Sequence, residues 1–179
     1  TGSGNLNFDD WKPDFLADYI VNTHHQYVRK YLPEIVQYMN KVAKVHGMQH
    51  PELSAIKEQV DLIHAELTAH MEEEENLIFP LAKEISQAAH SGTVYTREPG
   101  TTFRELVEKT EKEHDTAGRA LEAIRKLNNN YEIPADSCTS YKLLYKMLEE
   151  FESDLFIHIH LENNILFVKT RNLEQTLLK

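Results

Sequence analysis

Two stretches of the sequence repeat one polar pattern that could bind metal. Residues 70–79 read HMEEEENLIF and residues 158–167 read HIHLENNILF, and the second stretch lies 88 residues after the first. Both have the form H-x-x-x-E-x-N followed by two aliphatic residues and a phenylalanine. Residues four apart share one face of a helix. Each stretch can therefore aim an imidazole and a carboxylate at one ion, or at two neighbouring ions.

Two single histidines complete the repeat. His25 and His114 lie 89 residues apart, each within the apolar stripe of an expected helix. A hydrogen bond within the core usually explains a single buried histidine. It does not explain six polar groups on four inward faces, because buried carboxylates are costly unless they are paired or bound to metal. Pairing the two halves about a pseudo-twofold axis would bring together the six ligands that we predict, namely His25, His70, Glu74, His114, His158 and Glu162.

The expected ligand set of four imidazoles and two carboxylates suits iron, with manganese as the alternative. Zinc would be satisfied by four ligands at a single site. Another type of two-metal bundle uses Glu-x-x-His from two helices, but Glu111-x-x-His114 has no counterpart here. Two histidines, two shared carboxylates and a bridging oxygen give each metal five ligands, which leaves an open position for O2, NO or peroxide. We therefore expect two non-haem, oxo-bridged irons.

Four amphipathic helices are expected to position these residues. Their apolar stripes run through the six polar residues and continue to Leu77 and Val168. Breaker residues at 47–51, 91–100 and 128–134 separate the helices. This pattern predicts an all-α, antiparallel up-down four-helix bundle over residues 12–179. Residues 1–11 are interpreted as a linker or cloning remnant, chiefly on the TGSG at 1–4. The expected helices cover about 12–45, 51–85, 101–124 and 134–168.

Other polar side chains fit the predicted centre less well. His24 lies about 100° round the helix from His25 and is the competing choice of ligand. His46 shares the face of His25 but lies about 30 Å along the axis, which indicates a residue at the end of the bundle. Cys138 is expected to be a packed structural thiol. A solvated face is expected for Glu72, Glu73 and Glu75.

Composition excludes several classes of protein. The 179 residues suit one domain, and a formal net charge of −10 argues against binding to nucleic acid or an anionic membrane. No apolar run approaches the length of about 18 residues that a membrane span requires. The one cysteine excludes an internal disulfide and fits a reducing compartment. We therefore expect a cytoplasmic protein.

These residues resemble the C-terminal hemerythrin-like domain of the repair-of-iron-centres family, from about Phe15 to Phe167. The most specific motifs are EHDTAG at 113–118 and His158 followed by LENN at 161–164. LPE at 32–34, downstream of His25, and the stretch 70–80 also match. Hemerythrins proper carry a fifth histidine in the third-helix motif. This chain has Gly118 there, which favours the repair family over an oxygen carrier.

The resemblance implies a di-iron centre bridged by Glu74 and Glu162, with the four histidines as terminal ligands. It implies iron supply to stress-damaged or apo iron–sulfur proteins, and a nitric-oxide-reducing activity has been proposed for the family. Full-length members also carry an N-terminal domain with a cysteine motif, which these 179 residues do not include. We expect an iron-handling protein rather than an enzyme. The alternatives are an O2 or NO sensor, an NO-reducing protein, or a helical interaction module with vestigial ligands.

Overall fold

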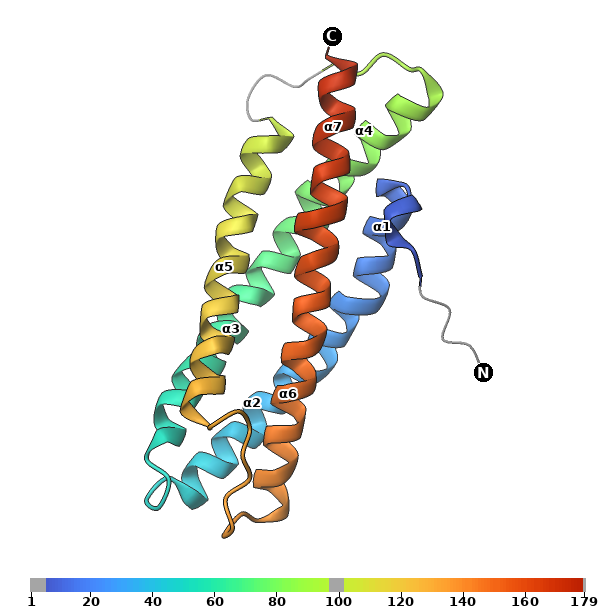
Figure 1. Ribbon diagram of the computed structural model, residues 1–179. Coiled ribbons are helices and arrows are strands. Elements are labelled where there is room, and N and C mark those ends of the chain that lie inside the picture. The colour runs from blue at the N-terminus through green and yellow to red at the C-terminus, as the bar shows by residue number, and fades with distance from the viewer. Residues whose placement is uncertain (1–5, 97–101, 179) are drawn as a thin grey trace, which may run out of the picture.

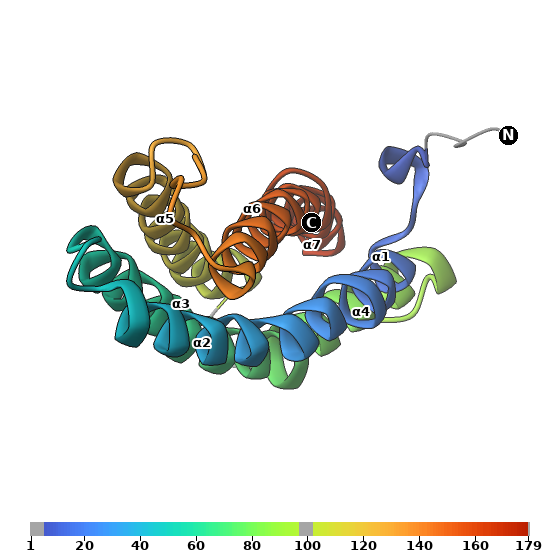
Figure 2. The ribbon, with the colours of Figure 1, turned by 90° about the horizontal axis from the view of Figure 1, so that it is seen from below.

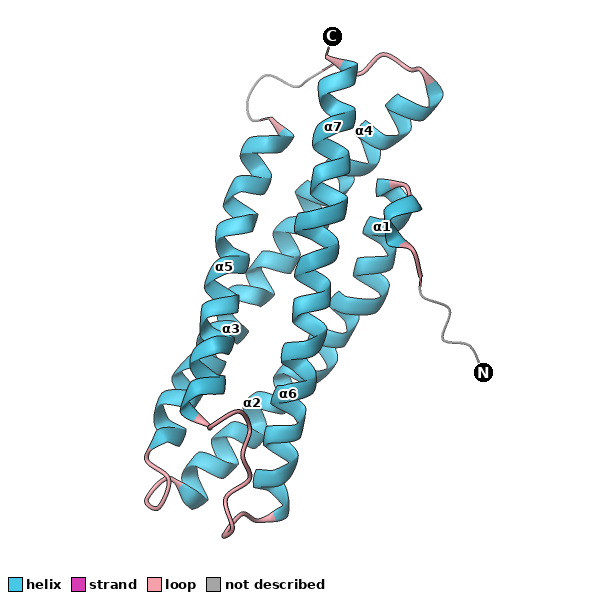
Figure 3. Cartoon of the chain, viewed as in Figure 1, coloured by secondary structure: helices cyan, strands magenta, loops and turns pink. Residues whose placement is uncertain are grey.

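The chain folds into four helical rods. The computed structural model describes residues 6–96 and 102–178, and within these ranges all regular structure is helical (Figure 3). A short 3-10 helix, η1 (Phe8–Asp10), precedes the first rod. The first rod comprises α1 (Pro13–Ile20), η2 (Val21–His25) and α2 (Gln26–His46), and the second comprises α3 (Glu52–Glu73), η3 (Glu74–Ile78) and α4 (Phe79–Ser91). The third rod is α5 (Phe103–Leu127), and the fourth comprises α6 (Thr139–His160), η4 (Leu161–Leu166) and α7 (Phe167–Leu177).

Successive rods run in opposite directions, so that the predicted up-down four-helix bundle is confirmed (Figure 1). Helix α2 packs against α3 and α6, and α3 packs against α5. At the other end of the bundle, α4 packs against α1 and α7. The end-on view in Figure 2 shows the first two rods as a curved layer, with the last two rods on one side of it. Each hairpin therefore faces the other along its whole length.

Three of the four rods contain a π-helical turn at the level of the predicted ligands. His25 ends η2, Glu74 begins η3 and Glu162 lies in η4, whereas α5 has no such turn. Such turns are rare in general and frequent at functional sites. Each turn inserts one residue into the helical repeat, so that the residues after it are rotated by about 100°.

The π turns explain two errors in the sequence-based assignment of the apolar stripes. Leu77 and Val168 are exposed, not buried in the core as expected. Because the register shifts at η3 and η4, Phe79 and Phe167 are among the residues that fill the core beyond the ligands. An uninterrupted α-helical repeat does not anticipate this shift.

The core consists of two apolar clusters, one on either side of the polar ligands along every rod. One cluster includes Leu32, Met39 and Phe151. The other, nearer the chain termini, includes Leu16 and Phe103. Each buried side chain of this size contributes about 1.5–3 kcal/mol. Two independent apolar clusters therefore clamp the polar centre between them.

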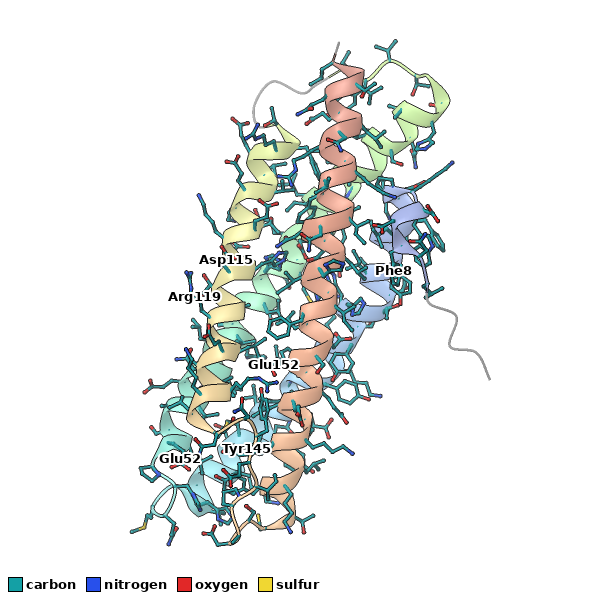
Figure 4. The ribbon with its side chains drawn as sticks, viewed as in Figure 1. Phe8, Glu52, Asp115, Arg119, Tyr145 and Glu152 are labelled. Carbon is teal, nitrogen blue, oxygen red and sulfur yellow. The ribbon has the colours of Figure 1, made fainter. Side chains whose placement is uncertain are left out.

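Local sequence features define where the rods begin and end. Thr102 and Glu105 form a capping box that starts α5, and α4 ends at Gly92 in the left-handed conformation (φ 68°). A buried carboxylate on α6, Glu152, accepts hydrogen bonds from Arg125 on α5 (Figure 4). The start expected at residue 101 and part of the breaker segment at 91–100 lie outside the described residues.

Ordered structure begins before residue 12. The 3-10 helix places Phe8 and Trp11 against the apolar cluster near the termini, and Lys169 on α7 donates a hydrogen bond to the Trp11 carbonyl at 2.7 Å. Figure 4 labels Phe8 beside α1. Phe8 and Trp11 thus pack against the bundle. The segment 1–4 lies outside the described residues, and the domain limit at 12 stays a prediction.

Candidate metal centre

All six side chains predicted as ligands meet at one level of the bundle, between the two apolar clusters. Their donor atoms form two groups, and within each group the atoms lie within 4.8 Å of one another. All six residues are buried. Both groups contain both carboxylates, so that the arrangement offers two neighbouring positions for a cation. One group is His25, Glu74, His158 and Glu162, and the other is His70, Glu74, His114 and Glu162.

Each imidazole turns its Nε2 atom toward the carboxylates. In one group, His25 Nε2 lies 3.3 Å from Glu74 Oε2 and His158 Nε2 lies 2.8 Å from Glu162 Oε1. In the other, His70 Nε2 lies 3.1 Å from Glu74 Oε1. His114 Nε2 lies 3.0 Å from Glu162 Oε2. Four nitrogen donors and two carboxylates thus converge from four rods on one small volume.

The donor atoms are poorly satisfied by hydrogen bonds within the chain. Despite the short distances above, both carboxylate oxygens of Glu74, one of Glu162 and Nε2 of His25 are buried without a suitably directed hydrogen bond. Buried polar atoms are almost always hydrogen-bonded, and leaving one unsatisfied costs about 1–3 kcal/mol. A metal ion that accepts these lone pairs would remove that cost. The residues present therefore fit a metal centre.

Electrostatic interactions within the group favour charged carboxylates. Burial raises the pKa of Glu74, as does the charge of Glu162, but the surrounding histidines outweigh both and lower it to about 2. Burial likewise opposes the charged form of Glu162, and the histidines, led by His158, hold its pKa well below the usual range. Both carboxylates are therefore anionic at neutral pH and offer two negative charges to cations in a site of low dielectric.

A second set of contacts orients three of the four imidazoles. The Nδ1 atom of each lies 2.7 Å from an acceptor on a neighbouring rod: Glu75 for His25, Glu113 for His70 and Asn163 for His114. Contacts of this kind fix the tautomer and raise the basicity of a ligating histidine. His158 differs, because its Nδ1 atom is buried without a partner.

The expectation of a fully solvated Glu75 is wrong. Its side chain is 26 % exposed and bonds to both His25 and Arg29 at 2.7 Å. It lies next to Glu74 at the interface of the first two rods, where a long side chain reaches the neighbouring imidazole. The repeat carried a signal for this role, because Glu75 corresponds to Asn163 in the second half. Each of the two follows a predicted bridging carboxylate and contacts the single histidine of its half. Of the other two, Glu72 is exposed and Glu73 pairs with Lys109 near the surface.

The competing histidine, His24, is buried but belongs to neither group of donors. Its Nδ1 atom lies 3.0 Å from Asp154 Oδ1. The interpretation of His46 as a bundle-end residue is confirmed, since its Nε2 atom lies 3.2 Å from Cys138 Sγ at the turn before α6. The expectation of a packed thiol is wrong, because Cys138 precedes the first turn of α6 and is exposed.

Comparison with known proteins is consistent with this geometry. The hemerythrin HHE cation binding domain matches residues 16–169. The chain belongs to this family. The predicted resemblance to a hemerythrin-like domain is thereby confirmed, and a cation-binding role agrees with the two groups of His and Glu donors in this hemerythrin-type bundle.

Curated relatives of this hemerythrin-type chain carry names that refer to repair. A "probable iron-sulfur cluster repair protein" of Haemophilus influenzae is 37% identical over 169 residues, which cover 93% of this chain and 70% of that protein. The iron-sulfur cluster repair protein YtfE of Yersinia pseudotuberculosis is 33% identical over 89% of this chain and 67% of its own length. The YtfE protein of Escherichia coli O81 is 34% identical over 88% and 67%, respectively. Among the described residues, no helix is long and apolar enough to cross a membrane.

Proposed function

We propose that the chain holds two iron ions through His25, His70, Glu74, His114, His158 and Glu162, and that it supplies iron for the repair of iron–sulfur clusters. The observation that carries the proposal is the sharing of both carboxylates by the two groups of donors. A single metal would need four of the six side chains. Two metals that share both carboxylates would use all six side chains as ligands.

The donor set supports iron over other metals. Imidazole suits iron, zinc and copper, whereas manganese prefers carboxylates and water. Zinc favours closed sites with four ligands of its own, and here each carboxylate would have to serve two ions. When bound, iron would supply redox chemistry and an open coordination position for a small ligand. The chain's own residues hold the ions, exclude bulk water and fix the imidazole tautomers.

The repair role is supported by the relatives, which are named iron-sulfur cluster repair proteins. The partners that this role requires are damaged or apo iron–sulfur proteins. Cys138 is the one thiol of the chain. A single exposed thiol agrees with the reducing cytosol that we assign to the protein.

A second candidate function is the binding or reduction of NO, or the binding of O2, by a centre that retains its iron. A small apolar pocket between α3 and α5 favours it. The pocket has a volume of about 20 Å³, which is enough for one small molecule. It borders the ligand side chains His70 and His114, and the apolar part of its lining comprises Leu62, Ile63, Leu67, Ala117 and Ala120.

Iron release separates the two functions. Glu74 and Glu162 hold a doubly charged ion less strongly than a triply charged one, so the reduced protein is expected to lose iron faster. The experiment follows transfer to a ferrous chelator, and to an apo iron–sulfur protein, from oxidised and anaerobically reduced samples. Free ferrous salt serves as the control. Faster release from the reduced protein, with reconstitution of the acceptor, supports supply. Equal and slow release from both forms, with NO bound at the retained iron, would favour the second function.

A further inference from the structure

The internal repeat extends beyond the six donors to the residues that support them. The residue after each shared carboxylate accepts a hydrogen bond from the single histidine of its own hairpin. In the first half, Glu75 serves His25, and in the second half, Asn163 serves His114. The two halves match at this position in both contact and distance.

The residue before each single histidine supports the other hairpin, and here the two halves differ. In the second half, Glu113 accepts a hydrogen bond from Nδ1 of His70 at 2.7 Å. The corresponding residue in the first half is His24, which lies against His158. A carboxylate in one half is thus replaced by an imidazole in the other.

His24 contacts His158 by stacking rather than by a hydrogen bond. The ring centroids are 5.6 Å apart and the planes differ by 21°. Asp154 holds the Nδ1 atom of His24 at 3.0 Å. Both Nε2 of His24 and Nδ1 of His158 are buried without a partner. His24 therefore fixes the plane of the His158 ring but does not increase the basicity of its ligating nitrogen.

We infer that His24 is a positioning residue for His158 and that it makes the two metal positions inequivalent. The position at His70 and His114 has two hydrogen-bonded imidazoles, whereas the position at His25 and His158 has one. A supporting contact of this kind changes metal affinity by about 10–100-fold. The position at His25 and His158 therefore binds its ion more weakly. If the chain supplies iron, as proposed above, this position gives up its ion first.

The test is anaerobic loading with ⁵⁷Fe²⁺ followed by Mössbauer spectroscopy. Two equivalents per chain should give two quadrupole doublets of equal area. Half an equivalent should mainly fill the tighter position, so that one doublet exceeds the other about sixfold or more for an affinity ratio of about 10–100. His24→Glu gives His158 a carboxylate like the one that supports His70, and Glu113→Ala removes that support from His70. Both substitutions should bring the two areas at half loading closer to equality. Glu72 is exposed, and the control substitution Glu72→Ala should leave the ratio of the areas unchanged.

Equal areas at half loading of the unchanged protein would overturn the inference. A ratio that Glu113→Ala leaves unchanged would overturn it as well, and this variant decides the matter if His24→Glu does not fold. If His24 only stabilised the fold, His24→Glu would change the stability of the protein without moving the ratio of the two areas toward one. The measurement needs no acceptor protein. Unequal positions together with no iron transfer would uphold this inference and refute iron supply.

Discussion

Replacement of Glu75 by alanine should weaken one of the two metal positions. The Glu75 carboxylate accepts a hydrogen bond from Nδ1 of His25 at 2.7 Å, and Arg29 holds the carboxylate from the other side. Without it, Nδ1 of a fully buried imidazole loses its partner, whereas Arg29 is partly exposed and can be solvated. The cost therefore falls on the ligand histidine.

The expected magnitude is that of a lost supporting contact, a fall in affinity of about 10–100-fold, or about 1.4–2.7 kcal/mol. His25 belongs to only one group of donors. One of the two binding constants should therefore fall, and the other should stay close to its original value. An anaerobic titration with Fe²⁺ against a chromophoric chelator measures both constants.

Glu73→Ala is the matched control. Glu73 lies in the same run of glutamates but pairs with Lys109 near the surface. It should leave both constants unchanged. Identical constants for the two variants and the unchanged protein would refute the reasoning, because they would show that the contact with His25 does not support the metal position.

Four further outcomes are expected. Glu74→Ala should reduce the content of both metals by elemental analysis, whereas Glu72→Ala should not, and equal loss from both would contradict the shared carboxylate. Protein stripped of metal should stay helical by circular dichroism but melt at least about 5 °C lower, because bound metal stabilises the fold by mass action. In the stripped protein, burial lowers the pKa of His25, but Glu162 and Glu74 outweigh this and raise it to about 10. The protonated form of His25 stabilises the fold, and this contribution is fully present below pH 6.5 and is lost as the pH rises toward 10. The stripped protein should therefore melt at a lower temperature at pH 9 than at pH 6. A higher melting temperature at pH 9 would contradict this. Away from the centre, Asp136 raises the pKa of His50. The NMR titration midpoint of His50 should therefore lie above 6.5 and should fall in Asp136→Asn. An unchanged midpoint in that variant would show that the ion pair does not raise the pKa of His50.

The sequence was sufficient to predict the bundle and the convergence of six polar side chains. The reason lies in the repeat, since His-x-x-x-Glu and a single histidine recur in the same order in both halves. An apolar stripe interrupted by carboxylates has few stable explanations other than a metal centre. His25 was preferred to His24 for the same reason, because it matches His114 in the repeat.

Other features depended on details that residue patterns do not encode. The π turns arise from backbone hydrogen bonds that shift by one residue, and hydropathy at Leu77 or Val168 gives no sign of the shift. The contact between Glu75 and His25 depends on the spacing of two rods, which a helical wheel does not contain. The exposure of Cys138 depends on where α6 begins.

The central claim is that the chain holds a pair of iron ions, and elemental analysis of the purified protein tests it most directly. Protein expressed with iron available should contain two irons per chain, and Glu162→Ala should lose most of both. Stoichiometric zinc in place of iron, or one metal per chain in a fully loaded sample, would contradict the account.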